Sequence, residues 1–113
     1  MEQVLIKNIP FSQALVMKDL VEYKEGTVIS RTISQRKDLS VTLFAFDKGE
    51  GISSHSASGD ALVYIMDGTA EITIGEEKVL AKAGEVVVMP ANIPQALDAV
   101  ERFNMFLVVI KPQ

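Results

Sequence analysis

Residues 49–68 read GEGISSHSASGDALVYIMDG, and residues 84–95 read GEVVVMPANIPQ. Each stretch begins at a glycine and combines a short apolar run with a segment rich in turn-forming residues. Short apolar runs separated by glycine, proline, serine and asparagine are typical of β-strands joined by turns. The two stretches therefore predict strands, and not helices, in the centre of the chain.

The same pattern continues over most of the sequence. Apolar runs rich in Val, Ile, Thr and Phe predict strands at residues 27–34, 39–46, 61–66, 70–74, 78–81, 85–89 and 102–110. The pair Asp67-Gly68 is typical of a hairpin turn, and only residues 9–20 are expected to contain a helical turn. Eight to ten short strands with almost no helix predict an all-β sandwich or barrel.

Composition excludes several classes of protein. The 113 residues fit one domain, and the excess of 15 acidic over 11 basic residues argues against a nucleic-acid partner. The chain has no cysteine and one histidine, which excludes a disulfide framework and most transition-metal sites made by protein side chains alone. No apolar run approaches the roughly 20 residues that a membrane span needs. Without a secretory signal or a cysteine, we expect a cytoplasmic protein with no membrane partner.

The two quoted stretches resemble the paired motifs of the cupin superfamily of small β-barrel proteins. Gly49, His55 and Gly68 fit the first motif of that family without a gap, and Gly84 and Pro90 fit the second. The resemblance implies an all-β, antiparallel cupin-type β-barrel (jelly roll) formed as a single domain by residues 1–113. It places the core motifs at 49–68 and 84–95, with residues 1–25 packing on the barrel as an N-terminal segment.

The resemblance also implies that most of the family's metal ligands are missing. Cupin metal sites use two His and one Glu from the first motif and one His from the second. His55 is retained here, whereas Ala57, Ala61 and Gln95 occupy the other three positions. A methyl group binds no metal, and alternation along a strand is expected to turn Asp60 away from Ala61. We therefore predict no metal, no cofactor and no catalytic residue; a weakly bound divalent metal at His55 is the less favoured alternative.

The remaining polar residues predict a small-molecule site in the barrel. The resemblance implies that His55 and Gln95 face each other across the barrel, where they would hold a neutral polar group such as a hydroxyl or carbonyl. Ala57 and Ala61 would line the space that an ion would otherwise fill. The favoured function is metal-independent binding or sensing of a small molecule. The alternatives are a cupin enzyme, dioxygenase or isomerase-like, with a divergent metal site, and a structural or interaction protein.

Residues 61–66 and 105–110 are apolar at every position. A strand that faces a core on one side and water on the other should alternate, so the outer face of these runs must also be covered. Along 61–66, odd positions should share one face and even positions the other. Either a loop or the N-terminal segment covers the outer face, or a second copy does. We favour the homodimer, because the mean hydropathy of +0.22 is high for a soluble monomer.

Overall fold

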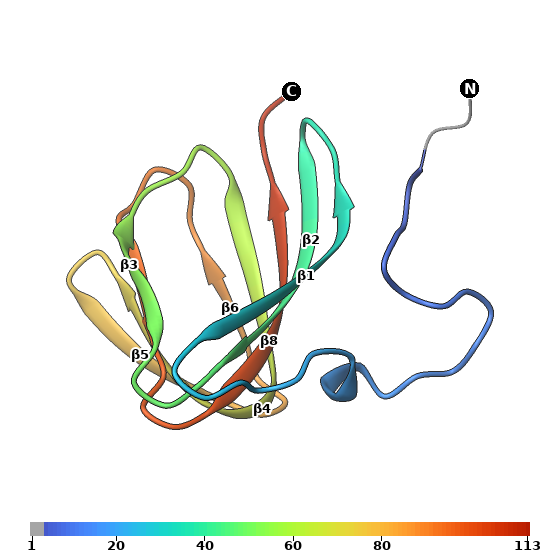
Figure 1. The fold of residues 1–113 in the computed structure, drawn as a ribbon. Helices are drawn as coiled ribbons and strands as arrows, with labels where there is room; N and C mark the ends of the chain where they lie inside the picture. Colours follow the sequence, from blue (N-terminus) through green and yellow to red (C-terminus); the bar gives the residue numbers. More distant parts are fainter. Residues whose placement is uncertain (1–3) are drawn as a thin grey trace.

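The computed structural model describes residues 4–113, which form an antiparallel β-structure with one short helix (Figure 1). The elements are a 3-10 helix η1 (Met17–Leu20) and the strands β1 (Val28–Gln35), β2 (Leu39–Phe46), β3 (Gly51–His55), β4 (Asp60–Ile74), β5 (Glu77–Lys82), β6 (Val86–Met89), β7 (Gln95–Asp98) and β8 (Phe103–Ile110). All strand pairs are antiparallel. The predicted all-β fold with eight to ten strands is confirmed, as is the helical turn within residues 9–20.

The strands form two sheets that share β4. The first sheet has the order β1-β2-β8-β4-β6 and uses the N-terminal part of β4. The second has the order β5-β4-β7-β3 and uses the C-terminal part. In Figure 1, β3 and β5 lie on one side of the molecule, β1 and β2 lie on the other, and the N-terminal segment runs outside β1 and β2. The space between the two sheets holds the main core.

The continuity of β4 corrects the prediction of a hairpin at Asp67-Gly68. The runs 61–66 and 70–74 are parts of one strand of 15 residues, and they pair with different neighbours instead of with each other. The pairing with β8 shifts register between Ile65 and Asp67, and Gly68 has φ +78°. This is a β-bulge, which bends a strand and increases its twist. Asp-Gly therefore bends the strand from one sheet into the other and does not reverse the chain.

Two strands, β3 and β7, were absent from the prediction. Both are short, and their sequences, GISSH and QALD, lack a run of β-branched residues. They pair with each other, and β7 also pairs with β4. Their strand structure therefore depends on tertiary pairing and not on local propensity.

The main core lies between the sheets and contains the largest side chains. The rings of Phe46 and Phe103 stack at 4.4 Å between centroids. The core is completed by Ala61, Val63, Ile65, Ala70, Ile72, Ala81, Met89, Leu97, Ala99 and Met105. Along the N-terminal part of β4 the odd positions are buried, whereas Leu62 and Tyr64 are each 39% exposed, which confirms the predicted division between two faces.

A second, smaller core lies on the outer face of the first sheet. Val21 of the N-terminal segment packs there against Ile33, Leu43 and Ala45. This contact joins one part of the N-terminal segment to the barrel, and residues 1–3 lie outside the described residues. The N-terminal segment covers the outer face of the sheet at β1 and β2. It leaves the outer face around Leu62 and Tyr64 exposed.

Replacing Gly68 by alanine should destabilise the fold more than replacing another glycine of positive φ. A Cβ on Gly68 would overlap the carbonyl oxygen of Arg102, whereas a Cβ on Gly84, with φ +91°, would meet nothing within 4 Å. We expect Gly68→Ala to lower the free energy of unfolding by about 3 kcal/mol or more. Gly84→Ala should lower it by about 1–2 kcal/mol, the strain of a left-handed alanine. Urea denaturation of both variants measures the difference, and equal losses would contradict the role assigned to Gly68.

Candidate functional site

His55 and Gln95 lie opposite each other on neighbouring strands. They are register partners in the pairing of β3 with β7, at the end of each strand. Residues directly opposite in an antiparallel pair point to the same face of the sheet. The structure therefore brings together the two polar residues that the sequence singled out, although no hydrogen bond joins their side chains.

The amide of Gln95 is buried in apolar surroundings. Gln95 is 6% exposed, and its Oε1 is buried without a hydrogen-bond partner among residues 4–113. Leu97, two residues along β7 and on the same face, belongs to the main core. A buried acceptor that has no donor destabilises a protein by about 1–3 kcal/mol. Most buried polar groups in proteins have a partner from the chain, from ordered water or from a ligand.

His55 is exposed and has one defined contact. Its Nδ1 lies 3.1 Å from the carbonyl oxygen of Ser53. Because a carbonyl only accepts hydrogen bonds, a neutral ring in this position carries its proton on Nδ1. Nε2 is then an acceptor that can meet a hydroxyl or N–H group. His55 thus supplies a polar contact at the surface beside the buried amide of Gln95.

Two hydrogen bonds join the loop after β6 to the loop after β3 and to the start of β4, near Ala57 and Ala61. Asn92 N donates to Ala57 O at 2.7 Å, and Asp60 Oδ1 accepts from Ala91 N at 2.8 Å. Asn92 has φ +65°, a conformation that asparagine tolerates better than most residues. Ala61 is buried and Ala57 is partly exposed.

These residues do not fit the metal site of the family. The side chains of Ala57 and Ala61 carry no donor atom, and one carboxylate oxygen of Asp60 is already bonded to the loop after β6. Within residues 4–113, no three His, Cys, Asp or Glu side chains lie in a group that could hold a metal ion. One imidazole and one amide fall short of the three or four ligands that zinc normally takes from a protein.

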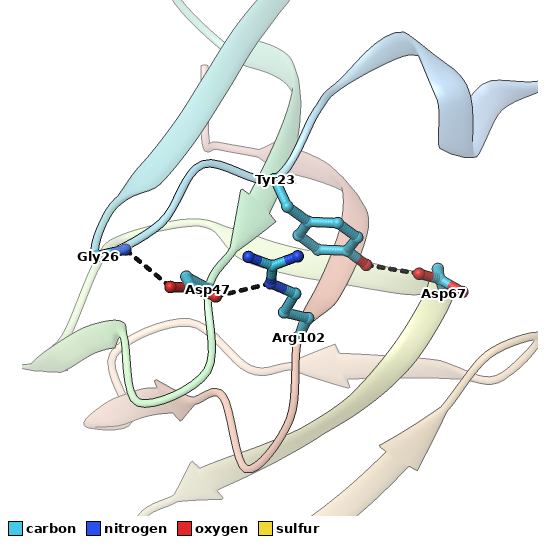
Figure 2. Close-up of polar contacts among 5 residues, drawn as sticks. All are labelled: Tyr23, Gly26, Asp47, Asp67 and Arg102. Carbon is cyan, nitrogen blue, oxygen red and sulfur yellow. Dashed lines mark hydrogen bonds and ion pairs between the residues drawn. The ribbon is translucent and has the colours of Figure 1, made fainter.

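A second polar group of residues, which the sequence analysis missed, ties the N-terminal segment to the barrel (Figure 2). Tyr23 donates its hydroxyl to Asp67 Oδ2 at 2.6 Å, and the guanidinium of Arg102 lies 5.4 Å from the centre of the Tyr23 ring. Arg102 Nε donates to Asp47 Oδ1 at 2.7 Å, and Gly26 N donates to Asp47 Oδ2 at 2.7 Å. We call these four side chains, Tyr23, Asp47, Asp67 and Arg102, the polar latch.

The latch shifts the titration of Tyr23 and of Asp47. Burial, together with the Asp67 carboxylate that accepts its hydrogen bond, raises the pKa of Tyr23 well above its usual range. The hydrogen bond from Arg102, helped by the one from Gly26, lowers the pKa of Asp47 to about 2. Both shifts favour the protonation states in which the latch contacts form.

Asn104 is the member of this region that a sequence signal could have revealed. It is a polar residue inside the apolar run 103–110, and it is 2% exposed. It pairs in register with Asp67 and with Ala45, so its side chain lies on the outer face of the first sheet. There Asn104 Nδ2 donates to the carbonyl oxygen of Lys18 at 2.9 Å.

In the described part of the chain, no helix is long and apolar enough to cross a membrane.

Comparison with known proteins gives consistent matches. The model of the cupin domain family matches residues 42–111. The conserved SPY1581 protein of unknown function from Streptococcus pyogenes has a crystal structure that matches with a TM-score of 0.96 at 46% identity, over 98% of this chain and 97% of that one. The cupin superfamily protein DSY2733 from Desulfitobacterium hafniense DCB-2 matches with a TM-score of 0.92 at 29% identity, over 96% and 100%.

A relative found by sequence comparison is also described as uncharacterized. The uncharacterized protein SCO3923 of Streptomyces coelicolor is 30% identical over 78 residues, which are 69% of this chain and 74% of that protein.

The polar latch predicts a definite pH dependence of stability. Asp47 has a pKa of about 2 in the folded chain against an ordinary 3.8, so its carboxylate stabilises the fold above about pH 4. That contribution is lost as the pH falls from about 4 to about 2. Asp47→Asn should therefore lower Tm at pH 7, and the difference from wild type should shrink over this acid range.

Thermal unfolding between pH 2 and 7 measures this difference. Glu76→Gln, in the exposed turn between β4 and β5, is the control and should leave Tm nearly unchanged at every pH. A difference for Asp47→Asn that stays constant down to pH 2 would contradict the ion pair.

Proposed function

The chain belongs to the cupin family of β-barrel proteins, and from this membership we propose that it is a metal-independent protein that binds or senses a small molecule near His55 and Gln95. The observation that carries the proposal is the buried Oε1 of Gln95, which has no hydrogen-bond donor among residues 4–113. A ligand hydroxyl or N–H would supply that donor. Ala57 and Ala61 add apolar contact without charge.

The chemistry of the two side chains limits the ligand. Gln95 Oε1 accepts a hydrogen bond, and Nε2 of a neutral His55 also accepts when Nδ1 faces Ser53. Both atoms are acceptors in that state, so the matching ligand group is a donor such as a hydroxyl or an N–H. Sugars, alcohols and small amides present such donors. The main core is filled by large side chains, which favours a ligand that inserts one polar group over one that fills the barrel.

The rival enzyme function, with a divergent metal site, has less support. It would rely on His55, Gln95 and Asp60, and one oxygen of Asp60 already accepts from Ala91 N. The argument against a metal centre rests on this poor set of donor atoms, and no reaction step is assigned to the site.

Replacing Gln95 tests the proposal before any ligand is known. Gln95→Met keeps an unbranched side chain of similar length and removes the unpaired amide. We expect it to raise the free energy of unfolding by about 1 kcal/mol, measured by urea denaturation. His55→Ala should change it by less than about 0.5 kcal/mol, because the ring is exposed. Destabilisation by Gln95→Met would mean that the amide is satisfied and structural, and would contradict the site.

The same variants serve in a ligand screen. Sugars, alcohols, small amides and small acids are tested by thermal shift, with and without dialysis against EDTA. A ligand present at 100 times its Kd stabilises by about 2.7 kcal/mol. We expect at least one neutral compound to raise the Tm of wild type, with or without EDTA, and to have no effect on Gln95→Met. A shift that requires a divalent metal would instead favour the enzyme.

The outer face of the first sheet supports a second role, self-association into a homodimer. Leu62 pairs in register with Val88 on β6 and with Val108 on β8, and Tyr64 pairs with Val86. Leu62 and Tyr64 are each 39% exposed and Val88 is 56% exposed. Register partners share a face, so these side chains form one continuous apolar surface. Among the described strands β6 pairs only with β4, which leaves its other edge available.

A second copy is the occupant that this surface favours. Contiguous apolar surface rimmed by polar residues is typical of protein interfaces, and a twofold axis lets one patch cover the same patch of its partner. We expect wild type to sediment as a dimer at 10–50 µM, and Val88→Lys to sediment as a monomer. The variant should keep the far-ultraviolet circular dichroism of wild type and have a lower Tm at equal protomer concentration, because it has lost the stabilisation that association gives. Leu80→Lys, at an exposed apolar position on β5, is the control and should remain dimeric. A monomeric wild type would contradict this role.

A further inference from the structure

A cleft of about 610 Å³ lies under the N-terminal segment, on the outer face of the first sheet. One wall is formed by residues of η1 and the residues after it. The other is formed by Asp67 of β4, by Arg102 just before β8 and by Asn104 in β8. His55 and Gln95 belong to the other sheet, on β3 and β7. The cleft is therefore separate from the site of the proposed function.

The wall of the cleft contains a buried acceptor without a donor. Asn104 is 2% exposed, and its Oδ1 has no hydrogen-bond partner among residues 4–113. The amide cannot be turned round, because its other end contacts the carbonyl of Lys18, which only accepts, and so Nδ2 must lie there. The oxygen thus has no donor among residues 4–113, and a ligand N–H or O–H would supply one.

The charge of the cleft favours a cation as that group. Asp19, Glu22 and Asp67 place three carboxylates along its walls. The charge of Arg102 is offset by Asp47, to which its Nε donates at 2.7 Å. Lys18 is the remaining basic residue of the lining. Acidic groups therefore exceed unpaired basic ones, which attracts positive charge and repels anions.

Asp67 provides the second contact that an ammonium group needs. It is the register partner of Asn104 across the β4–β8 pairing, and the bulge in β4 turns it toward the N-terminal segment. Its Oδ2 accepts from Tyr23, as Figure 2 shows. A carboxylate can accept more than one hydrogen bond. An ammonium nitrogen carries three N–H donors and no acceptor, so it satisfies an amide oxygen and a carboxylate at once.

We propose that this cleft binds a small aliphatic amine, with the ammonium group held by the Asn104 amide oxygen and the Asp67 carboxylate. The carboxylates of Asp19 and Glu22 attract positive charge on the rest of the ligand, so a diamine binds more tightly than a monoamine of the same length. Because Asn104 and Tyr23 also hold the segment that roofs the cleft, the bound amine fixes Met17–Leu20 and the residues up to Tyr23 more firmly on the barrel.

The proposal is tested by calorimetric titration of the full chain with 1,4-diaminobutane at pH 7, in 20 and 150 mM NaCl. We expect saturable one-site binding in both, weaker at the higher salt. Butylamine should bind several-fold less tightly, and 1,4-butanediol at least tenfold less tightly. Absence of saturation by the diamine up to 50 mM would overturn the proposal. Equal binding of the diol would also overturn it, because the ligand would then be neutral.

Matched carboxylate variants separate a specific site from general attraction to an acidic protein. Asp67→Asn keeps an oxygen that can accept from Tyr23 and should weaken binding of the diamine at least tenfold. Asp98→Asn removes an exposed carboxylate on β7, outside the cleft, and should weaken it less than twofold. Equal weakening by the two would mean non-specific attraction and would contradict the site. Gln95→Met should leave the affinity unchanged, so this proposal can fail or hold independently of the first.

A measurement on wild type covers the case in which Asp67→Asn does not fold. Titration of ¹⁵N-labelled protein with 1,4-diaminobutane should shift the side-chain amide signals of Asn104 and the backbone signals of residues 18–23. Shifts confined to β3 and β7 would overturn the assignment to this cleft.

Discussion

The close approach of Gly68 to the carbonyl oxygen of Arg102 is the constraint on which the architecture depends. No side chain fits between the two backbones, so β4 passes the start of β8 at the distance that only glycine allows. The adjacent bulge then turns the second half of β4 into the other sheet. The shared strand sets the position of both sheets, and with them the core between Phe46 and Phe103. It also turns Asp67 outward, where the polar latch forms.

The sequence predicted the fold class because its apolar runs are long enough to be identified as strands. Where the local sequence signal was weak, or was compatible with two structures, the sequence did not predict the structure correctly. Asp67-Gly68 is compatible with either a hairpin or a bulge, and the choice depends on which strands lie alongside, which is a property of the whole fold. The strands β3 and β7 are stabilised by pairing with each other and with β4, and residues such as Ser53 and Ser54 carry little preference for a strand.

The candidate site was also predicted only in part from the sequence. The resemblance to the cupin motifs implied that His55 and Gln95 would face each other across the barrel, and they are register partners on neighbouring strands. Burial of the Gln95 amide without a donor depends on the packing of Leu97 and the core, which no local pattern encodes. Asn104 stood in an apolar run, but its importance lies in facing Asp67 and Lys18, residues far away in sequence. Two buried amide oxygens that lack partners among residues 4–113 are unfavourable for stability, and sites at which stability has been given up are typical places for ligands.

The latch has a consequence for how this protein can be observed. The chain has no tryptophan and two tyrosines, so near-ultraviolet spectra depend mainly on Tyr23 and Tyr64. Tyr23 is fixed between the Asp67 carboxylate and the Arg102 guanidinium, whereas Tyr64 lies on the open face of the first sheet. A rigid, asymmetric environment gives an aromatic ring a circular dichroism signal that a mobile ring lacks. The two phenol rings therefore act as native optical probes, one for release of the N-terminal segment and the other for events on the exposed sheet.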